Sequence, residues 1–144
     1  MRRSGFHLTH LLLAALACFS VYQHADAADP GLSIIPQLQE RFGFTEVQVR
    51  GALGALLVYV SERLPKTQFD EVAKSIPNAD YIMSEVHIRG IVTMPLDDIE
   101  DYEASLASLG IGQPLASQFA PAVLECLGAA GFERERDILA RVVD

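Results

Sequence analysis

Histidine and cysteine are scarce in this sequence, whose 144 residues include four histidines and two cysteines. All of them except His87 and Cys126 lie before residue 28, in a stretch that has the pattern of a removable signal peptide. A zinc site built from cysteine and histidine needs about four ligands, so the remaining pair cannot form one. A single cysteine forms no disulfide within the chain, which excludes disulfide-stapled helical folds such as the saposin-like lipid binders.

Recognisable catalytic patterns are also missing. Cys126 and His87 are the only thiol and imidazole left for a nucleophilic pair. Cys126 falls between Val123 and Leu127 at helical spacing, where cysteine usually serves as a small buried apolar residue. The sequence contains neither a Gly-x-Ser-x-Gly turn nor a Gly-x-x-x-x-Gly-Lys phosphate loop. We therefore expect no enzymatic activity, no catalytic residue and no cofactor.

Positive charge is in short supply, with 11 Lys and Arg against 19 Asp and Glu. Because Arg2, Arg3 and Asp26 precede residue 28, residues 28–144 keep 9 basic and 18 acidic side chains, a formal charge of −9. Nucleic acids and anionic membrane surfaces are both bound through Lys and Arg. We therefore expect neither to be a partner.

Acidic residues gather in one segment, at Asp97, Asp98, Glu100, Asp101 and Glu103. Asp97 and Asp101 would share one face of a helix, which makes a carboxylate metal site one interpretation. No glycine follows in the arrangement of an EF-hand calcium loop. Acids at the start of a helix are favoured by its positive end. We expect a helix start here and no metal site.

The first 27 residues have the pattern of an export signal. Arg2 and Arg3 supply the positive end, Leu8 to Val21 the apolar run, and Ala25-Asp26-Ala27 the small-x-small cleavage site. The apolar run is shorter than the roughly 20 residues of a membrane span, which argues against a retained anchor. We expect a periplasmic or extracellular protein that has no stable transmembrane span after cleavage.

Two further predictions concern this end of the chain. Leu16-Ala17-Cys18 loosely resembles a bacterial lipoprotein signal, so lipid anchoring at Cys18 is a minor alternative. The domain organisation is a signal peptide at 1–27, a flexible lead-in at 28–32 and a single helical domain at 33–144.

The stretch from Thr45 to Pro65 predicts the central helix of that domain. Thr45 and Gln48 form a capping-box pattern. No residue from 51 to 61 is charged, so the helix is apolar nearly all round and belongs in a core. Gly51 and Gly54 leave shallow surface for a neighbouring helix, and tight packing there offsets their low helix propensity.

The other helices are predicted from apolar residues at helical spacing. They begin at the caps Ser33, Thr67 and Asn78, at about Asp97, at Pro114 and at about Glu133. Predicted stops are Gly43 before Phe44, Pro77, Gly110 before Ile111, and Gly128 with Gly131. The segment from His87 to Leu96 is predicted as a loop or a short extended piece, and Pro121 as a bend or a split in its helix. The expected fold is an all-α bundle of about six to seven helices around a central apolar helix.

Several short motifs resemble the VcgC/VcgE-type bacterial domain of unknown function. They are Phe42-Gly43-Phe44-Thr45, the glycine-alanine run from Gly51 to Leu57, Phe69 with Ile76-Pro77-Asn78-Ala79-Asp80, Leu109-Gly110-Ile111, and Gln118 to Leu124. The resemblance runs from about Ile35 to Val143 and departs from the pattern between Ser84 and Ile99. It implies a small exported helical protein with no catalytic residues to carry over.

Two functions agree with these observations. The first is an exported non-enzymatic protein of the bacterial envelope that binds a partner protein or assembles with itself. The second is a periplasmic carrier of a small apolar ligand or lipid, held between the helix at Gly51 to Val60 and the helix at Phe119 to Leu127. Tyr59, Tyr81 and Tyr102 are interpreted as core edges with a hydrated hydroxyl rather than as a ligand surface.

Overall fold

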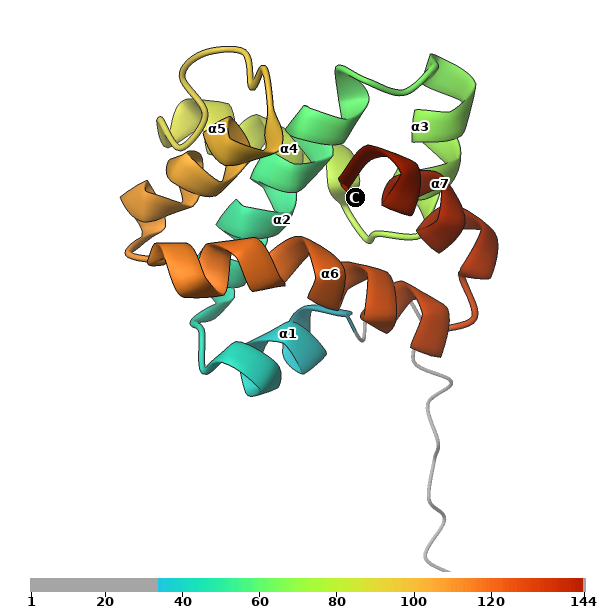
Figure 1. The fold of residues 1–144 in the computed structure, drawn as a ribbon, viewed down its shortest axis with the longest axis horizontal. Coiled ribbons are helices and arrows are strands. Elements are labelled where there is room, and N and C mark those ends of the chain that lie inside the picture. The colour runs from blue at the N-terminus through green and yellow to red at the C-terminus, as the bar shows by residue number, and fades with distance from the viewer. Residues whose placement is uncertain (1–33, 144) are drawn as a thin grey trace, which may run out of the picture.

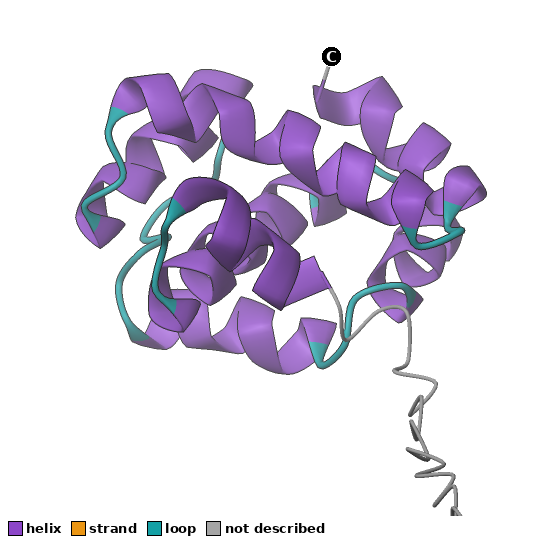
Figure 2. Ribbon diagram, turned by 90° about the horizontal axis from the view of Figure 1, so that it is seen from below, coloured by secondary structure: helices purple, strands orange, loops and turns teal. Residues whose placement is uncertain are grey.

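A computed structural model describes residues 34–143, and this part of the chain is all-α (Figure 1). Its helices are α1 (Ile34–Phe42), α2 (Glu46–Ser61), α3 (Lys66–Lys74), α4 (Ala79–Ile88), α5 (Ile99–Ser105), the 3₁₀ helix η2 (Leu106–Leu109), α6 (Gln113–Ala129) and α7 (Glu133–Val143). Figure 2 shows helices and connecting loops, with no strand among the described residues. The predicted fold class is confirmed.

Helix α2 is the interior helix of the bundle, as its apolar sequence predicts. Every residue from 51 to 60 is buried. The helices α1, α3, α4, α5 and η2 all contact it. The capping box is present, since the Thr45 N–H donates to Gln48 Oε1 at 3.0 Å and the Gln48 N–H donates to Thr45 Oγ1 at 3.3 Å.

The closest helix approach in this core is between α2 and α4 at Gly54. A Cβ at this position would lie 2.7 Å from the carbonyl oxygen of Ile82 and 2.7 Å from Val86 Cγ1. Real side chains never come so close, so only glycine permits this packing. The close approach predicted for the glycines of α2 is therefore present, and α4 is the helix that uses it at Gly54.

The N-terminal and C-terminal helices cover α2 from other sides. The Phe42 ring stacks on Phe44 with centroids 5.1 Å apart and lies 5.7 Å from the Phe119 ring of α6. Gly43 between the two phenylalanines has φ +67°, the left-handed conformation that ends α1 as predicted. Gly110 ends η2 in the same way, and Gly131 follows the end of α6.

Helix α6 is continuous through Pro121, so the predicted split is wrong. Proline removes one hydrogen bond, to the carbonyl of Ser117, and both residues lie on the exposed side of the helix, where water can replace it. Phe119 and Val123 on the buried side hold the two halves against the core. The predicted stop at Gly128 is also wrong, because that residue lies within the last turn.

Three predicted helix starts need correction. Helix α3 begins one residue before Thr67, with Pro65 at the cap position and no capping hydrogen bond. Asn78 does precede α4, but in a left-handed conformation (φ 57°) without a side-chain cap. Asp98, not Asp97, caps the fifth helix, by accepting a hydrogen bond from the Asp101 N–H at 2.8 Å.

Two helix ends also differ from the prediction. Helix α2 ends at Ser61, four residues before Pro65, and α4 continues to Ile88. The loop therefore begins at Arg89, two residues later than predicted.

The predicted signal peptide at 1–27, the lead-in at 28–32, Cys18 and the cap Ser33 lie outside the described residues. Within residues 34–143, none of the helices combines the length and the hydropathy that a membrane crossing requires.

Candidate functional site

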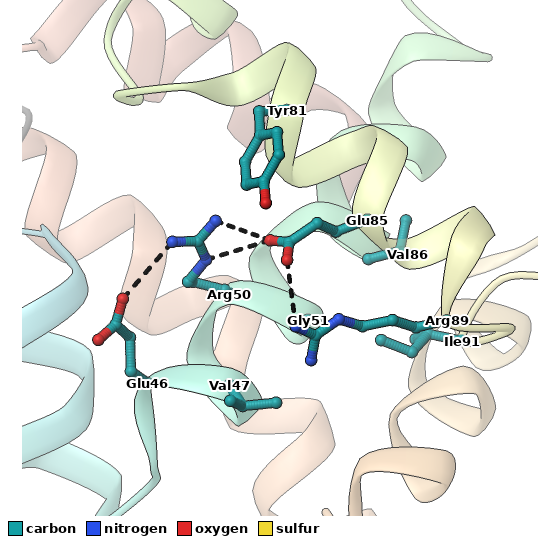
Figure 3. A pocket seen from close by; sticks show the side chains of 9 residues that line it. All are labelled: Glu46, Val47, Arg50, Gly51, Tyr81, Glu85, Val86, Arg89 and Ile91. Atoms are coloured by element: carbon teal, nitrogen blue, oxygen red, sulfur yellow. Dashed lines mark hydrogen bonds and ion pairs between the residues drawn. The ribbon is translucent and has the colours of Figure 1, made fainter.

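A hollow of about 300 Å³ lies on the surface between α2 and α4 (Figure 3). Its lining comes from the first turns of α2, from the exposed side of α4, and from Arg89 and Ile91 in the loop that follows. Gly51 is among its lining residues, and the close packing at Gly54, one turn further along α2, holds the two helices together.

Four charged side chains form a network in this hollow. Glu85 is its centre: its Oε2 accepts from Arg50 Nη2 at 2.7 Å and Nε at 3.2 Å, and its Oε1 accepts from Arg89 Nη2 at 3.1 Å. Glu46 Oε1 adds a longer contact to Arg50 Nη1 at 3.5 Å. The hydrogen bond to Glu85 raises the pKa of Arg50. Two acids and two bases leave the hollow close to neutral, so it has no unpaired charge to attract an anion.

Large apolar side chains are exposed around this hollow and beside it. In the described part of the chain there are five such residues, and four of them are Val47, Tyr81, Ile88 and Met94, which we call the α4 face. Ile88 is 83 % exposed and Met94 74 %. Tyr81 and Ile88 are seven residues apart, which places them on the same side of α4. The fifth residue, Leu115, is on α6.

A second hollow, of about 500 Å³, lies along the loop between α4 and α5, and we call it the loop groove. Its lining is residues 91–97 together with Asp101, Ala104 and Ser105 of α5. Ile91 lines both the first hollow and the loop groove, so the two are neighbours.

The loop that lines this groove is held by the end of α2. Arg63 donates to the carbonyl oxygen of Leu96 at 2.6 Å and to that of Tyr59 at 2.9 Å, with its guanidinium 3.7 Å from the centre of the Tyr59 ring. Glu62 accepts a hydrogen bond from the Leu96 N–H at 3.3 Å. His87 Nδ1 lies 3.2 Å from the carbonyl oxygen of Val92. Because the loop is tied at both ends, the groove is a preformed feature.

The two residues of the only conceivable thiol-imidazole pair lie in different environments. Cys126 is buried in α6, and burial raises the pKa of its thiol, the opposite of what activates a cysteine nucleophile. His87 belongs to the last turn of α4 and faces the Val92 carbonyl. No hydrogen bond joins His87 to Cys126 in the part of the chain that the structure describes.

The acidic segment is at the start of α5, as predicted. Asp98 caps the helix, and Glu100 and Asp101 lie in its first turn. Asp101 accepts from the Asp97 N–H at 3.0 Å, and Glu103 accepts from Gln113 Nε2 at 2.6 Å. Among residues 34–143 no three His, Cys, Asp or Glu side chains converge in a way that could hold a metal ion.

The tyrosines differ from the prediction of hydrated core edges. Tyr102 is completely buried, and its hydroxyl has no hydrogen-bond partner among the described residues. This burial raises the pKa of Tyr102. Tyr59 is also buried, with its ring 6.0 Å from that of Tyr102 and its hydroxyl 3.5 Å from the carbonyl oxygen of Val142. Only Tyr81 is exposed, and it contributes to the α4 face.

Sequence reasoning missed the residues that shape these hollows. The spacing of Tyr81 and Ile88 was a usable signal, because it puts two large side chains on one side of α4, away from the side that buries Ala79, Ile82 and Val86. The pairs Glu46–Arg50 and Glu85–Arg89 have the readable i,i+4 spacing, but the contacts of Arg50 with Glu85 and of Arg63 with Leu96 span 35 and 33 residues and gave no signal. Met94 lies in a loop, where no periodicity indicates exposure.

Comparison with known proteins gives one match. No curated protein and no solved structure matches the chain. The family model described as "Protein of unknown function VcgC/VcgE (DUF2780)" matches residues 19–140, most of the chain, and includes the loop groove. The resemblance inferred from the motifs is thus confirmed: the chain belongs to the VcgC/VcgE family of proteins of unknown function.

Proposed function

We propose that this is an exported protein of the bacterial envelope that acts without catalysis, by binding a partner protein through the α4 face. The observation that carries this proposal is that Val47 and Tyr81 are exposed in the lining of the first hollow and Met94 in the lining of the neighbouring loop groove, while Ile88 is exposed on the same side of α4 as Tyr81. Exposed apolar side chains that occur singly are ordinary, whereas a group of them beside preformed hollows is typical of a binding surface.

The arrangement of polar groups around this face also suits a protein partner. Tyr81 presents an aromatic ring whose neighbour is the Arg50 guanidinium, 5.3 Å from the ring centre. Tyrosine and arginine are the residue types that most often carry binding energy at protein interfaces. The hydrogen bonds to Glu85 hold the Arg50 side chain beside the Tyr81 ring before a partner arrives, which lowers the entropy cost of binding.

A different protein is favoured over a second copy of this chain. Residues 28–144 have a formal charge of −9, so two copies repel each other over most approaches. The apolar area of the α4 face would have to overcome that repulsion in a homodimer. A partner of neutral or positive charge meets no such cost.

Export is supported by the sequence of residues 1–27, with its positive end, apolar run and small-x-small site. The expected product is a chain that begins at Ala28. Intact-mass measurement of the protein purified from its host tests this directly. A mass that includes residues 1–27 would show that the signal is retained. A mass that includes acyl chains on Cys18 would show a lipid-anchored protein. Either result would contradict the proposed cleavage before Ala28.

Absence of catalysis is supported by the state of the two reactive groups. The thiol of Cys126 has a raised pKa, and the imidazole of His87 is engaged by a backbone carbonyl. A carrier role has less support. Neither of the two hollows described above has a lining residue from α6, and the space beside the α2 glycines is occupied by Leu109, Ile82 and Val86.

Co-purification from the host with matched surface variants tests the proposed function. Tyr81→Ser removes an exposed ring from the α4 face, and Leu115→Ser removes an exposed apolar side chain from α6. We expect one protein to co-purify with the wild type and with Leu115→Ser, and its yield to fall about tenfold with Tyr81→Ser. Equal recovery with both variants, or no stoichiometric companion of the wild type, would contradict the proposal.

A further inference from the structure

The loop groove combines an apolar base with an acidic edge. Ile91, Val92 and Leu96 are almost completely buried and form its base, while Met94 stands exposed beside them. Ala104 of α5 adds a small apolar residue on the other side, and Asp97 and Asp101 complete the lining. Its volume of about 500 Å³ is within the range of clefts that hold a ligand.

The two charged residues that line this groove, Asp97 and Asp101, are both acidic. The chain has no lysine or arginine from Gly90 to Glu133. Arg63 lies beside this loop, but its guanidinium donates to the carbonyl oxygens of Leu96 and Tyr59, and Arg89 is paired with Glu85. Among the residues that the structure describes, neither Asp97 nor Asp101 takes part in an ion pair. Both residues are exposed, although Oδ2 of Asp101 already accepts a hydrogen bond from the Asp97 N–H at 3.0 Å.

These two properties define the occupant by charge complementarity. An anionic or purely apolar occupant would leave the carboxylates unpaired or repelled. A purely cationic occupant would leave the apolar base and Met94 uncovered. A protein segment that carries a large aliphatic side chain next to lysine or arginine would cover the apolar base and also pair with the carboxylates.

We infer that the loop groove binds a basic amphipathic segment of a partner protein, with an aliphatic side chain against Ile91, Val92 and Leu96 and a lysine or arginine at Asp97 and Asp101. The inference rests on the proposed function and adds the chemistry of the partner to it. A second copy of this chain is a poor occupant, because its strongly acidic surface would approach the same two carboxylates. Attraction between exposed charges makes the binding weaken as salt rises.

Binding of designed peptides to the full protein, purified as its host produces it, tests the inference. The probe is a fluorescent helical peptide of leucine, lysine and alanine. The same peptide with glutamate for lysine, and one with serine for leucine, serve as comparisons. We expect fluorescence anisotropy to show binding of the leucine-lysine peptide at least about tenfold tighter than of either comparison peptide. If the serine-lysine peptide binds as tightly as the leucine-lysine peptide, binding depends only on non-specific charge attraction, and the inference is wrong.

Matched variants locate the peptide. Met94→Ser and Ala104→Arg alter exposed residues that line the groove, so neither disturbs the core, and each is expected to weaken binding about tenfold. Leu115→Ser and Glu100→Gln change an exposed apolar residue and an exposed acid that do not line it, and are expected to change affinity less than about twofold. Similar losses in both pairs would contradict the assignment.

The two proposals fail separately. If Tyr81→Ser abolishes co-purification while the groove variants bind the peptide like the wild type, the α4 face stands and the groove assignment is wrong. If the partner still co-purifies with both Tyr81→Ser and Met94→Ser, the proposed function itself is wrong. If the protein associates with itself and Met94→Ser abolishes that association, the occupant of the loop groove is a second copy of the chain and not a basic segment of another protein.

Discussion

At the scale of single residues, Gly51 and Gly54 lie one turn apart in the same helix, but the atoms that face them differ in how freely they can move. A Cβ at Gly54 would meet a backbone atom, the carbonyl oxygen of Ile82 at 2.7 Å. A Cβ at Gly51 would meet the ends of two side chains, with Leu109 at 2.8 Å and Ile91 at 3.1 Å. A partly exposed leucine such as Leu109 can rotate away, whereas the α4 backbone moves only with the whole helix.

We therefore predict opposite outcomes for the two alanine variants. Both gain about 1 kcal/mol of helix propensity. Gly54→Ala also forces α2 and α4 apart, an overpacking cost of about 1–3 kcal/mol that lowers the net stability. Gly51→Ala is expected to leave the free energy of unfolding unchanged within about 0.5 kcal/mol or to raise it. Urea unfolding measures both, and equal destabilisation by the two variants would refute this packing account.

Tyr102 is a second residue whose effect can be predicted. Burial, followed by the nearby charge of Glu103, raises the pKa of its hydroxyl above the ordinary value of 10.0. Below about pH 10 both folded and unfolded states keep the proton, so this group adds no pH dependence. Above it the unfolded state ionises first, and stability falls by about 1.4 kcal/mol per pH unit. Tyr102→Phe removes this loss and also removes a hydroxyl without a partner.

Urea unfolding at about pH 8 and about pH 11 checks this prediction for the wild type and Tyr102→Phe. The variant is expected to be at least as stable as the wild type at the lower pH, and its advantage to grow by about 1 kcal/mol at the higher pH. A constant difference between the two proteins would mean that the hydroxyl titrates equally in the folded and unfolded states.

Local residue roles were predictable, and roles set by distant partners were not. The Thr45–Gln48 cap and the left-handed Gly43 and Gly110 follow from chemistry within a few residues. The buried hydroxyl of Tyr102 contradicts the prediction of a hydrated one, because its burial is decided by α2 and α6. The network around Glu85 depends on α2 and α4 lying side by side.

At the scale of elements, the end of α2 controls the loop that follows α4. Arg63 and Glu62 hold Leu96 from its carbonyl and its N–H, and the Tyr59 ring supports the Arg63 guanidinium. Hydrogen bonds to a charged group contribute about 1.5–3 kcal/mol each, so this is a strong local anchor. The shape of the loop groove therefore depends on α2.

Arg63→Ala is predicted to loosen this loop without unfolding the bundle. Amide hydrogen exchange in residues 93–97 should become at least about tenfold faster, since the loop loses its anchor, while exchange in α6 stays unchanged. Arg41→Ala is the control, because it breaks an exposed ion pair with Glu125 far from the loop in sequence. Unaltered exchange in the loop of Arg63→Ala would show that other contacts hold it.

The helices themselves were largely predictable from apolar spacing, and their bounds less so. Helix α7 has the predicted bounds, whereas α2 ends at Ser61 because Glu62 and Arg63 turn toward the loop. Helix α6 passes through Pro121 because its buried side is anchored on both sides of the proline. Both departures come from tertiary contacts, which single-segment periodicity does not contain.

At the scale of the whole molecule, a filled interior and an uneven surface belong together. Most apolar side chains are buried around α2, and four of the five large exposed ones lie in the first turns of α2, in α4 and in the loop after it. The all-α fold and the central helix were predicted because both follow from composition and periodicity. The α4 face was not, because it arises only when α4, the first turns of α2 and the loop meet.

The central claim is that the α4 face is where this protein meets its partner. Site-specific photo-crosslinking in living host cells tests it most directly, with the crosslinker placed in turn at Tyr81, Met94, Leu115 and Ala107, all of which are exposed. We predict one and the same protein adduct from Tyr81 and Met94, and none from Leu115 or Ala107. Adducts of equal yield from all four positions, or from Leu115 and Ala107 alone, would contradict the account.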